Sequence, residues 1–344
     1  MKKIYRILDA NINRVAEGIR VVEDVCRFYF ETENLTEKLR DIRHNIRKNL
    51  KELDFIMINE RDTEHDIGKD ITLKSNIDKK DSLSQIINAN FKRALEGIRV
   101  IEEILKTLDN MYYLGKKFEN IRYEIYYIEK SVLQLINRKK IPKGLYGITM
   151  ESCSNGRTNI EVVKEMIKSG IKIIQYREKD KSFKEMYKEA KILRELTKKS
   201  ETIFIINDHI ELAMMVDADG VHIGQDDWPI NEVRRLIGDD KIIGISTHSK
   251  EQAIEAVKSG ADYIGVGPIF KTNTKDYSPV GIEYLKFVVK NIKIPFIAIG
   301  GIKENNLEEI IKTGATRIAL VTEITAAQNI EEKIKRLNKM FNKI

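Results

Sequence analysis

The sequence has few cysteines and no long apolar run, and each absence excludes a class of protein. Only two cysteines occur in 344 residues, Cys26 and Cys153, and they lie too far apart in sequence for a metal-binding spacing or a disulfide framework. No stretch approaches the ~18 apolar residues of a membrane-spanning helix, and the N-terminus lacks the apolar core of a signal peptide. We therefore expect a cytoplasmic protein that does not associate with membranes.

Several ligand-binding motifs are also absent. The chain has no nucleic-acid-binding motif, no P-loop, no glycine-rich kinase loop and no glycine-rich dinucleotide turn. Its net charge of +7 and pI of 9.0 come from dispersed lysines and arginines rather than from a basic block. This pattern favours phosphorylated small molecules as partners over nucleic acid, and it leaves homo-oligomerisation open.

The chain is long enough for two domains, and the first, residues 1–138, is helical and duplicated. The segment Asp9–Val25 (DANINRVAEGIRVVEDV) returns as Asn88–Ile104 (NANFKRALEGIRVIEEI), an offset of 79 residues. In both copies apolar residues recur at spacings of four and three, which is typical of a helix with one buried face. In the second copy this stripe is predicted from Phe91 to Asp109, and a second periodic segment follows in each copy. Two tandem helix-pair repeats therefore predict an all-α domain, a four-helix bundle.

One carboxylate interrupts the apolar stripe at the same place in both copies, at Glu23 and Glu102. A carboxylate on a buried face needs a partner, and the repeated Arg43 and Arg122 are the natural candidates. Two interpretations stay open: structural ion pairs that brace the helices, or a polar pocket on the pseudo-twofold axis that holds an anionic ligand. The polar segment 59–70 between the copies is a further functional candidate, through Arg61, Asp62, Asp66 and Gly68.

The second domain, residues 139–344, alternates short β-rich apolar runs with amphipathic segments. Eight runs are predicted as strands, at 145–149, 171–177, 202–208, 220–224, 241–247, 263–270, 295–301 and 317–323. Their nearly continuous apolar character is typical of parallel strands buried on both faces. Eight β/α units in this length predict an α/β fold, the TIM (β/α)₈ barrel. A doubly wound open sheet is the alternative, and the missing dinucleotide turn after the first strand argues against it.

Polar side chains cluster where these strands end, which is where barrel enzymes keep their chemistry. Asp208 and Asp227 follow adjacent strands and are hard oxygen ligands, suited to a Mg²⁺ ion that also binds phosphate oxygens. Arg177, Lys179 and Lys275 add positive charge that would hold a diphosphate and stabilise it as it departs. The strand ends therefore predict a metal-dependent diphosphate site.

A second anion site is predicted at the Gly300-Gly301 turn after the seventh strand, together with the end of the eighth. Barrels commonly bind a phosphate there with backbone N–H groups. Two anion sites are the layout for coupling two phosphorylated substrates. Among the histidines, His222 lies inside a buried strand and is interpreted as structural, whereas His248 has no assigned role.

The barrel resembles thiamine-phosphate synthases over about 200 residues, in six strings that occur in order at the strand ends. They are QYREKD, IINDHIELA, ADGVHIGQDDWP, IGISTHS, ADYIGVGPIFKTNTK and IAIGGI. The resemblance implies a Mg²⁺-dependent transferase that condenses 4-amino-2-methyl-5-(diphosphooxymethyl)pyrimidine with a thiazole phosphate. The products would be thiamine phosphate and diphosphate, with ionisation before attack. Tyr176 stands where the family usually has Leu, and Thr322 where Ser is common.

The resemblance also implies a set of site residues. The pyrimidine diphosphate would contact Gln175, Tyr176, Arg177, Glu178, Lys179, Asn207, Ser246 and Lys275, and the catalytic members would be Arg177, Lys179, Ser246 and Lys275. The thiazole phosphate would contact Thr272, Asn273, Thr274, Gly301, Val321 and Thr322. Mg²⁺ would bind Asp208 and Asp227. The alternative, a thiazole tautomerase, would bind a thiazole phosphate but would not need the metal and diphosphate residues.

The helical domain resembles one that is fused to some thiamine-phosphate synthases. The shared features are the paired RxxEGIRVxE motifs and the string RDTEHDIG. This resemblance implies a hydroxymethylpyrimidine-phosphate kinase that uses ATP, which would make the chain a multifunctional enzyme. Because the sequence has no nucleotide-binding motif, a non-catalytic module for oligomerisation or substrate handover stays open as the alternative.

Overall fold

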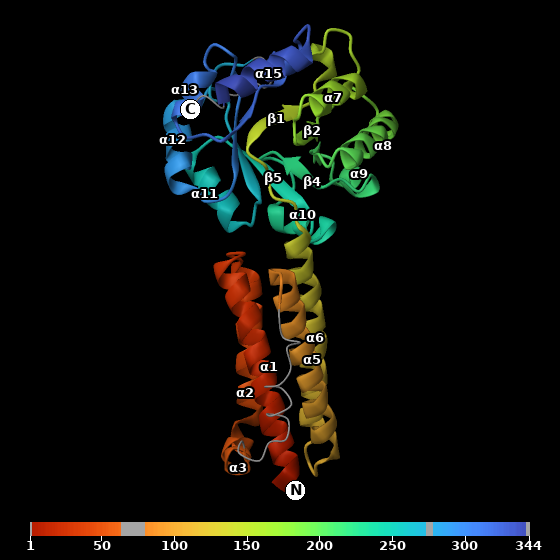
Figure 1. Ribbon diagram of the computed structural model, residues 1–344, viewed down its shortest axis with the longest axis vertical. Helices are drawn as coiled ribbons and strands as arrows, with labels where there is room; N and C mark the ends of the chain where they lie inside the picture. The colour runs from red at the N-terminus through yellow and green to blue at the C-terminus, as the bar shows by residue number, and fades with distance from the viewer. Residues whose placement is uncertain (1, 63–79, 273–277, 342–344) are drawn as a thin grey trace. The chain divides into compact units, whose positions relative to one another are not determined.

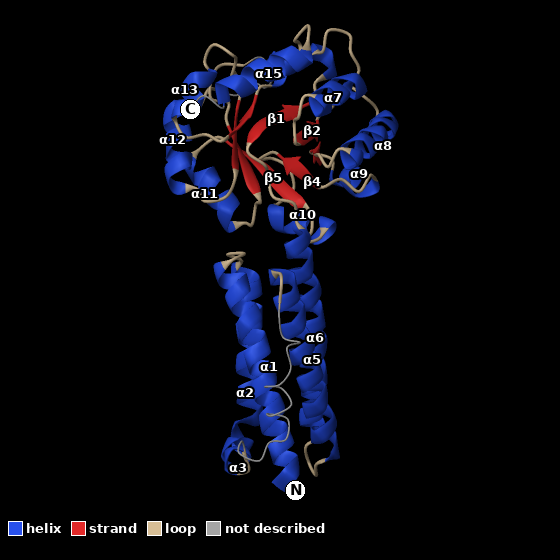
Figure 2. Cartoon of the chain, in the orientation of Figure 1, coloured by secondary structure: helices blue, strands red, loops and turns tan. Residues whose placement is uncertain are grey.

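The computed structural model describes residues 2–62, 80–272 and 278–341, and the chain divides into two compact units, Met1–Asn137 and Arg138–Ile344. The described part of the first unit is helical, and the second is a closed barrel of eight parallel strands surrounded by helices (Figures 1 and 2). The predicted fold class is thus confirmed. No helix within these described ranges combines the length and the apolar content needed to cross a membrane.

The described part of the first unit consists mainly of four long helices, as the duplication predicts. They are α1 (Lys2–Phe28), α2 (Glu33–Leu50), α5 (Leu83–Thr107) and α6 (Tyr112–Asn137), with a short 3₁₀ turn (Lys51–Leu53) and α3 (Asp54–Asn59) after α2. A Cβ atom on Gly18 would lie 2.8 Å from the backbone oxygen of Asn90, and one on Gly97 would lie 2.8 Å from Val15. The repeated glycine therefore lets α1 and α5 approach closely, and these two contacts show that the helices run antiparallel.

The buried stripe of the second copy is shorter than predicted. Phe91, Ile98, Glu102 and Leu105 are buried, but α5 ends at Thr107. Asp109 lies beyond that end and is exposed, so its predicted place on the buried face is wrong. The chain must turn there to begin the next helix, and the helical period no longer applies to it.

The second unit is a barrel in which β1 pairs with both β2 and β8, which closes the sheet. The strands are β1 (Gly144–Ile148), β2 (Ile173–Tyr176), β3 (Ile203–Asn207), β4 (Gly220–Ile223), β5 (Ile242–Thr247), β6 (Tyr263–Val266), β7 (Phe296–Ile299) and β8 (Arg317–Ala319). The predicted eighth strand was too long. Its pairing with both neighbours ends at Ala319, so Val321–Thr325 are free to form the short helix α14.

Helices follow the strands on the outside of the barrel (Figure 2). They are α7 (Asn159–Lys168), α8 (Phe183–Lys199), α9 (Ile210–Met215), α10 (Ile230–Ile237), α11 (Lys250–Lys258), α12 (Gly281–Asn291), α13 (Leu307–Lys312) and α15 (Ile330–Phe341), with a 3₁₀ turn (Glu151–Cys153) after β1. One apolar core lies between strands and helices and contains Ile174 and Phe204, whereas a smaller core inside the barrel contains Ile173 and Ile205. Side chains of neighbouring strand residues point to opposite faces, which produces the two cores.

Candidate functional site

A cavity of about 420 Å³ opens at the carboxyl ends of the barrel strands, and every strand contributes to its lining. Eight of the predicted site residues line this cavity: Gln175, Arg177, Asn207, Ser246, Thr272, Gly301, Val321 and Thr322. Three more, Asn273, Thr274 and Lys275, lie outside the described residues. The structure thus brings together residues from the ends of β2, β3 and β5 and from the segments that follow β6, β7 and β8.

Two predicted substrate contacts point away from the cavity. Tyr176 is buried on the outer face of β2, where its hydroxyl donates to Glu189 Oε2 at 2.7 Å. Glu178 is also turned outward and accepts from Asn159 Nδ2 at 3.0 Å and from the backbone N–H of Lys179 at 2.9 Å. The strand period of two explains both cases, because inward and outward side chains alternate. Neither residue is therefore placed to touch a substrate in the cavity.

Glu178 belongs to a carboxylate cluster with Glu151 and Glu189 that has the spacing of a metal site. The ammonium group of Lys181 already lies among these oxygens, 2.7 Å from Glu151 Oε2 and 2.9 Å from Glu189 Oε1. The described residues therefore supply the compensating charge themselves. We interpret this cluster as a brace for the loop after β2, which carries Arg177.

The predicted metal ligands lie at the rim, outside the cavity lining. Asp208 follows β3 with a positive φ of 62°, and its Oδ2 lies 2.5 Å from Lys179 Nζ. Asp227 follows β4, is exposed, and accepts the backbone N–H of Gly224 at 2.6 Å. Lys179 is thus paired with a predicted metal ligand and does not line the cavity.

The cavity floor contains a polar network that the sequence analysis missed. Tyr146 and Tyr263 are buried, and their hydroxyl oxygens lie 2.8 Å apart. His222 shares hydrogen bonds with Tyr263 (2.9 Å) and with Ser246 Oγ (3.0 Å), and Gln175 Nε2 donates to Tyr146 at 3.2 Å. His222 is buried as predicted, and it also lines the cavity. The sequence did not indicate that the two tyrosines belong to a site, because each lies in a continuously apolar strand.

The glycine turn after β7 has the backbone that only glycine adopts readily. Gly300 and Gly301 have φ values of 95° and 63°. A Cβ on Gly300 would lie 2.4 Å from Pro268 Cα, and one on Gly301 would lie 2.6 Å from the backbone oxygen of Lys271. The turn therefore packs directly on the loop after β6. Lys271 and Lys303, which the sequence analysis did not select, also line the cavity there.

His248, left without a role from sequence, lines the cavity beside the same loops. Its Nδ1 shares a hydrogen bond with the backbone oxygen of Gly267, just after β6. The loops after β5 and β6 are thereby tied together at the cavity wall.

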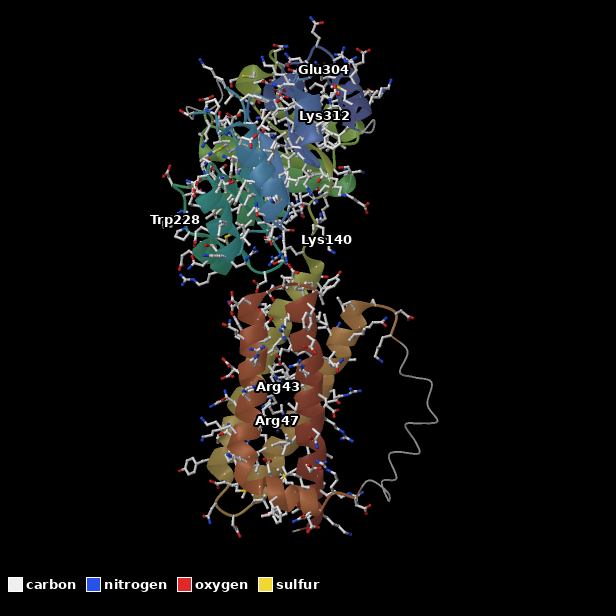
Figure 3. All side chains as sticks on the ribbon, turned by 90° about the vertical axis from the view of Figure 1, so that its left-hand side faces the viewer. Arg43, Arg47, Lys140, Trp228, Glu304 and Lys312 are labelled. Atoms are coloured by element: carbon white, nitrogen blue, oxygen red, sulfur yellow. The ribbon has the colours of Figure 1, made fainter. Side chains whose placement is uncertain are left out.

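In the helical unit, the repeated carboxylates Glu23 and Glu102 are fully buried. Arg43 Nε donates to Glu23 Oε2 at 3.0 Å, and Arg122 Nε donates to Glu102 Oε2 at 2.9 Å (Arg43 is labelled in Figure 3). Lys106 adds a further ion pair to Glu102. The predicted burial and the predicted arginine partners are both confirmed, and each ion pair lies within one copy of the repeat.

These two ion pairs do not share one pocket on the pseudo-twofold axis. Each glutamate lies five residues beyond its repeated glycine, Gly18 or Gly97, where the antiparallel helices α1 and α5 meet. At 1.5 Å per residue, the two carboxylates are therefore roughly 20 Å apart along the helices. The interpretation as one axial pocket is wrong, and two separate braces remain.

The segment between the two copies is anchored to α1 at its start. Arg61 forms a two-pronged ion pair with Asp9, with its Nε 2.8 Å from Oδ2 and a terminal nitrogen 2.7 Å from Oδ1. Arg6 donates to the backbone oxygen of Asp62 at 2.6 Å. The other two residues singled out in this segment, Asp66 and Gly68, lie outside the described residues. The second copy has Asn88 in place of Asp9, so this anchor belongs to the first copy alone.

Comparison with known proteins covers both units. A family model described as thiamine monophosphate synthase matches residues 145–324, and a model of the ThiD2 family matches residues 6–131. A thiamine-phosphate synthase of Synechocystis sp. is 38% identical over 348 residues, which covers 99% of this chain and 97% of that protein. One of Caldicellulosiruptor saccharolyticus is 56% identical over 195 residues, covering 56% of this chain and 88% of that protein. The solved thiamine phosphate pyrophosphorylase of Pyrococcus furiosus is 37% identical with a TM-score of 0.54, covering 58% of this chain and 95% of that one.

Proposed function

Because the chain belongs to the thiamine monophosphate synthase family, we propose that its barrel joins a pyrimidine diphosphate to a thiazole phosphate. The substrates would be 4-amino-2-methyl-5-(diphosphooxymethyl)pyrimidine and a thiazole phosphate, and the products thiamine phosphate and diphosphate. The observation that carries the proposal is the cavity, which Arg177, Asn207 and Ser246 line from the ends of three strands together with the Gly300-Gly301 turn. The chain would thus be a transferase.

The pyrimidine half of the site consists of neutral hydrogen-bonding groups below and cationic groups at the rim. Gln175, Asn207 and Ser246 would hold the ring, and Arg177 with Lys179 would face the diphosphate. As the methylene C–O bond breaks, its electron pair leaves with the diphosphate, and the aminopyrimidine carries the resulting positive charge. The thiazole nitrogen then forms the new C–N bond. Fixed positive charge beside the leaving group is the main contribution asked of the protein.

The rim residues suit a magnesium ion. Asp208 and Asp227 offer carboxylate oxygens from adjacent strands, and Asp208 already holds a cation in the form of the Lys179 ammonium group. Bound Mg²⁺ would neutralise diphosphate oxygens during departure. Lys179 would then turn from Asp208 toward the diphosphate.

The thiazole phosphate would bind against the glycine turn. Gly301, Val321 and Thr322 line the cavity just after the neighbouring strands β7 and β8. Backbone N–H groups in such a turn bind phosphate oxygens well. Lys271 and Lys303 would add positive charge at the same place.

Diphosphate release tests this proposal directly. The purified full chain is incubated with both substrates and Mg²⁺, and diphosphate and thiamine phosphate are measured. We expect both products in equal amounts, and neither when the thiazole phosphate is omitted. A chain that isomerises the thiazole phosphate and releases no diphosphate would be a tautomerase, and the synthase proposal would then be wrong.

For the helical unit we propose phosphorylation of hydroxymethylpyrimidine phosphate by ATP, which would supply the diphosphate that the barrel uses. The observation that supports it is the match of the ThiD2 family model to residues 6–131, which span both helix-pair copies. The terminal phosphoryl group of ATP would pass to the phosphate of the pyrimidine, leaving ADP. A module for oligomerisation or handover remains the alternative because no nucleotide loop is present.

The full chain separates these two possibilities. With ATP and the pyrimidine monophosphate we expect ADP and pyrimidine diphosphate in equal amounts. The variant Arg177→Gln should lose condensation in the barrel while keeping ADP formation, which assigns the kinase to the other unit. Absence of pyrimidine-dependent ADP in the unmodified chain would favour the non-catalytic module.

A further inference from the structure

The polar network at the floor of the cavity is one continuous chain of hydrogen bonds that joins five strands. It runs from Gln175 on β2 to Tyr146 on β1, Tyr263 on β6, His222 on β4 and Ser246 on β5. All but Ser246 are at least 90% buried. Its two ends, Gln175 and Ser246, are the residues that the proposed function places against the pyrimidine ring.

The donor at one end, together with the need of each buried proton for an acceptor, determines the direction of every bond. The Gln175 amide nitrogen can only donate, so the Tyr146 oxygen accepts. Tyr263 is the one other partner of the Tyr146 hydroxyl among the described residues, and a buried O–H group needs an acceptor, so the Tyr146 proton goes to Tyr263. The Tyr263 proton then goes to His222 Nδ1, which must accept. A neutral imidazole with an accepting Nδ1 carries its proton on Nε2, and that proton goes to Ser246 Oγ.

Burial supports this assignment of protons. Desolvation raises the pKa of both Tyr146 and Tyr263 above the ordinary value for tyrosine. Each hydroxyl therefore carries one proton at neutral pH, and each link has one donor. The proton of Ser246 is not used in the bond from His222, and Gln175 Oε1 accepts no hydrogen bond from the described part of the chain.

We infer that this directed chain sets the hydrogen-bonding polarity of the cavity floor, with Ser246 as a donor and Gln175 Oε1 as an acceptor. Tyr146, Tyr263 and His222 are then positioning residues that select an aminopyrimidine. The inference rests on the proposed synthase function. An exocyclic amino group donates to Gln175 Oε1, and a ring nitrogen accepts from Ser246. In a 4-oxo analogue the exocyclic atom becomes an acceptor, so two acceptors would face each other at Gln175.

Removing the Tyr263 hydroxyl, in the middle of the chain, should weaken the selection of the amino substrate over its 4-oxo analogue as well as weaken substrate binding. In Tyr263→Phe, His222 Nδ1 loses its donor and the Tyr146 proton loses its acceptor. Gln175 and Ser246, the two ends of the chain, can then each act as a donor or as an acceptor toward the pyrimidine ring. A site built to hydrogen-bond a polar group rejects the mismatched analogue strongly, because buried groups are left unpaired. We expect the ratio of kcat/KM for the amino substrate to that for its 4-oxo analogue to fall about tenfold.

The test uses the full chain and both pyrimidine diphosphates. Tyr284→Phe is the matched control: its hydroxyl is buried and donates to Thr247 Oγ1 at 2.6 Å, but Tyr284 does not line the cavity. The selectivity ratio should fall in Tyr263→Phe and stay unchanged in Tyr284→Phe. If Tyr263→Phe lowers kcat/KM for both substrates by the same factor, Tyr263 has only a structural role and the inference is overturned.

A second measurement is made on the unmodified chain, and a variant serves only to assign its signals. Nitrogen-15 NMR of the full chain reports which ring nitrogen of His222 carries the proton, and its signals are assigned by their loss in His222→Gln. We expect a protonated Nε2 and an unprotonated Nδ1. The opposite tautomer would reverse the chain and overturn the inference, even with the synthase reaction intact. Failure of the unmodified chain to release diphosphate would instead contradict the proposed function and leave the tautomer result to stand by itself.

Discussion

Replacing Gly301 by alanine should raise the KM for the thiazole phosphate and leave the KM for the pyrimidine diphosphate nearly unchanged. Gly301 has a φ of 63°, which an alanine adopts at a cost of about 1–2 kcal/mol. Its Cβ would also lie 2.6 Å from the backbone oxygen of Lys271 and 2.8 Å from the backbone carbon of Phe270. Both atoms are main chain and cannot rotate away, so the glycine turn itself must move.

The size of the effect follows from the hydrogen bonds that the turn is proposed to make. A hydrogen bond to a charged group contributes about 1.5–3 kcal/mol. Losing one backbone N–H contact to the phosphate should therefore raise the KM roughly 10- to 150-fold, at about 1.4 kcal/mol per tenfold change. Steady-state kinetics with each substrate varied in turn would measure both KM values.

Gly260→Ala is the matched control for backbone strain. Gly260 has a φ of 86°, but no atom lies within 4 Å of a Cβ built there. This variant should lose only the strain contribution, about 1–2 kcal/mol of the free energy of unfolding, while keeping both KM values. The reasoning is refuted if Gly301→Ala leaves the KM for the thiazole phosphate unchanged, or raises both KM values by the same factor.

Three further predictions concern the ion pairs and the metal. Arg122→Met leaves the Glu102 carboxylate buried beside fewer cations. It should lower the free energy of opening of α5, measured by hydrogen exchange, by about 3 kcal/mol. The double variant Arg122→Met with Glu102→Leu should regain most of that free energy, because it no longer buries an unpaired charge. Burial alone would raise the pKa of Glu102, but hydrogen bonds from Lys106 and Arg122 outweigh it and lower that pKa. Its contribution to stability is therefore present above the ordinary carboxylate pKa and lost as pH falls through the lowered value, and Glu102→Gln should flatten this acid limb of the unfolding curve. Asp208→Asn should raise the Mg²⁺ concentration for half-maximal diphosphate release at least about tenfold, whereas Asp226→Asn, an exposed neighbour of Asp227, should leave it unchanged.

Local periodicity was sufficient to predict the long helices of the first unit and the eight strands of the second. The spacing of apolar residues by four and three predicted the helix pairs, and the eight apolar runs correspond to the eight strands of the barrel. Element ends were less predictable. β8 stops at Ala319 because pairing with both of its neighbours stops there, and no property of the residues that follow shows this in sequence. The length of a strand depends on its partners as well as on its own residues.

The direction in which individual side chains point determined which predicted site residues reach the cavity. Arg177 lines the cavity, while its neighbours Tyr176 and Glu178 point outward and brace the loop. The sequence QYREKD, which contains all three residues, resembles the family over its whole length. That resemblance does not show which of the three side chains points into the cavity and which points outward. The face is decided by where the strand begins in the sheet, because one step along a strand reverses the side.

The sequence by itself determined the duplicated helices, the barrel and the chemical types gathered at its strand ends, since these depend on short-range patterns and on residue identity. The repeat also predicted the arginine partners of the buried glutamates, but only the tertiary structure decided which other groups meet. It paired Lys179 with Asp208, set the two buried glutamates on separate sites, and joined Tyr146 and Tyr263 from strands 117 residues apart into the floor of the cavity. Hydrogen bonds depend on distances of a few ångströms between atoms, and such distances between remote segments are fixed by how the barrel closes.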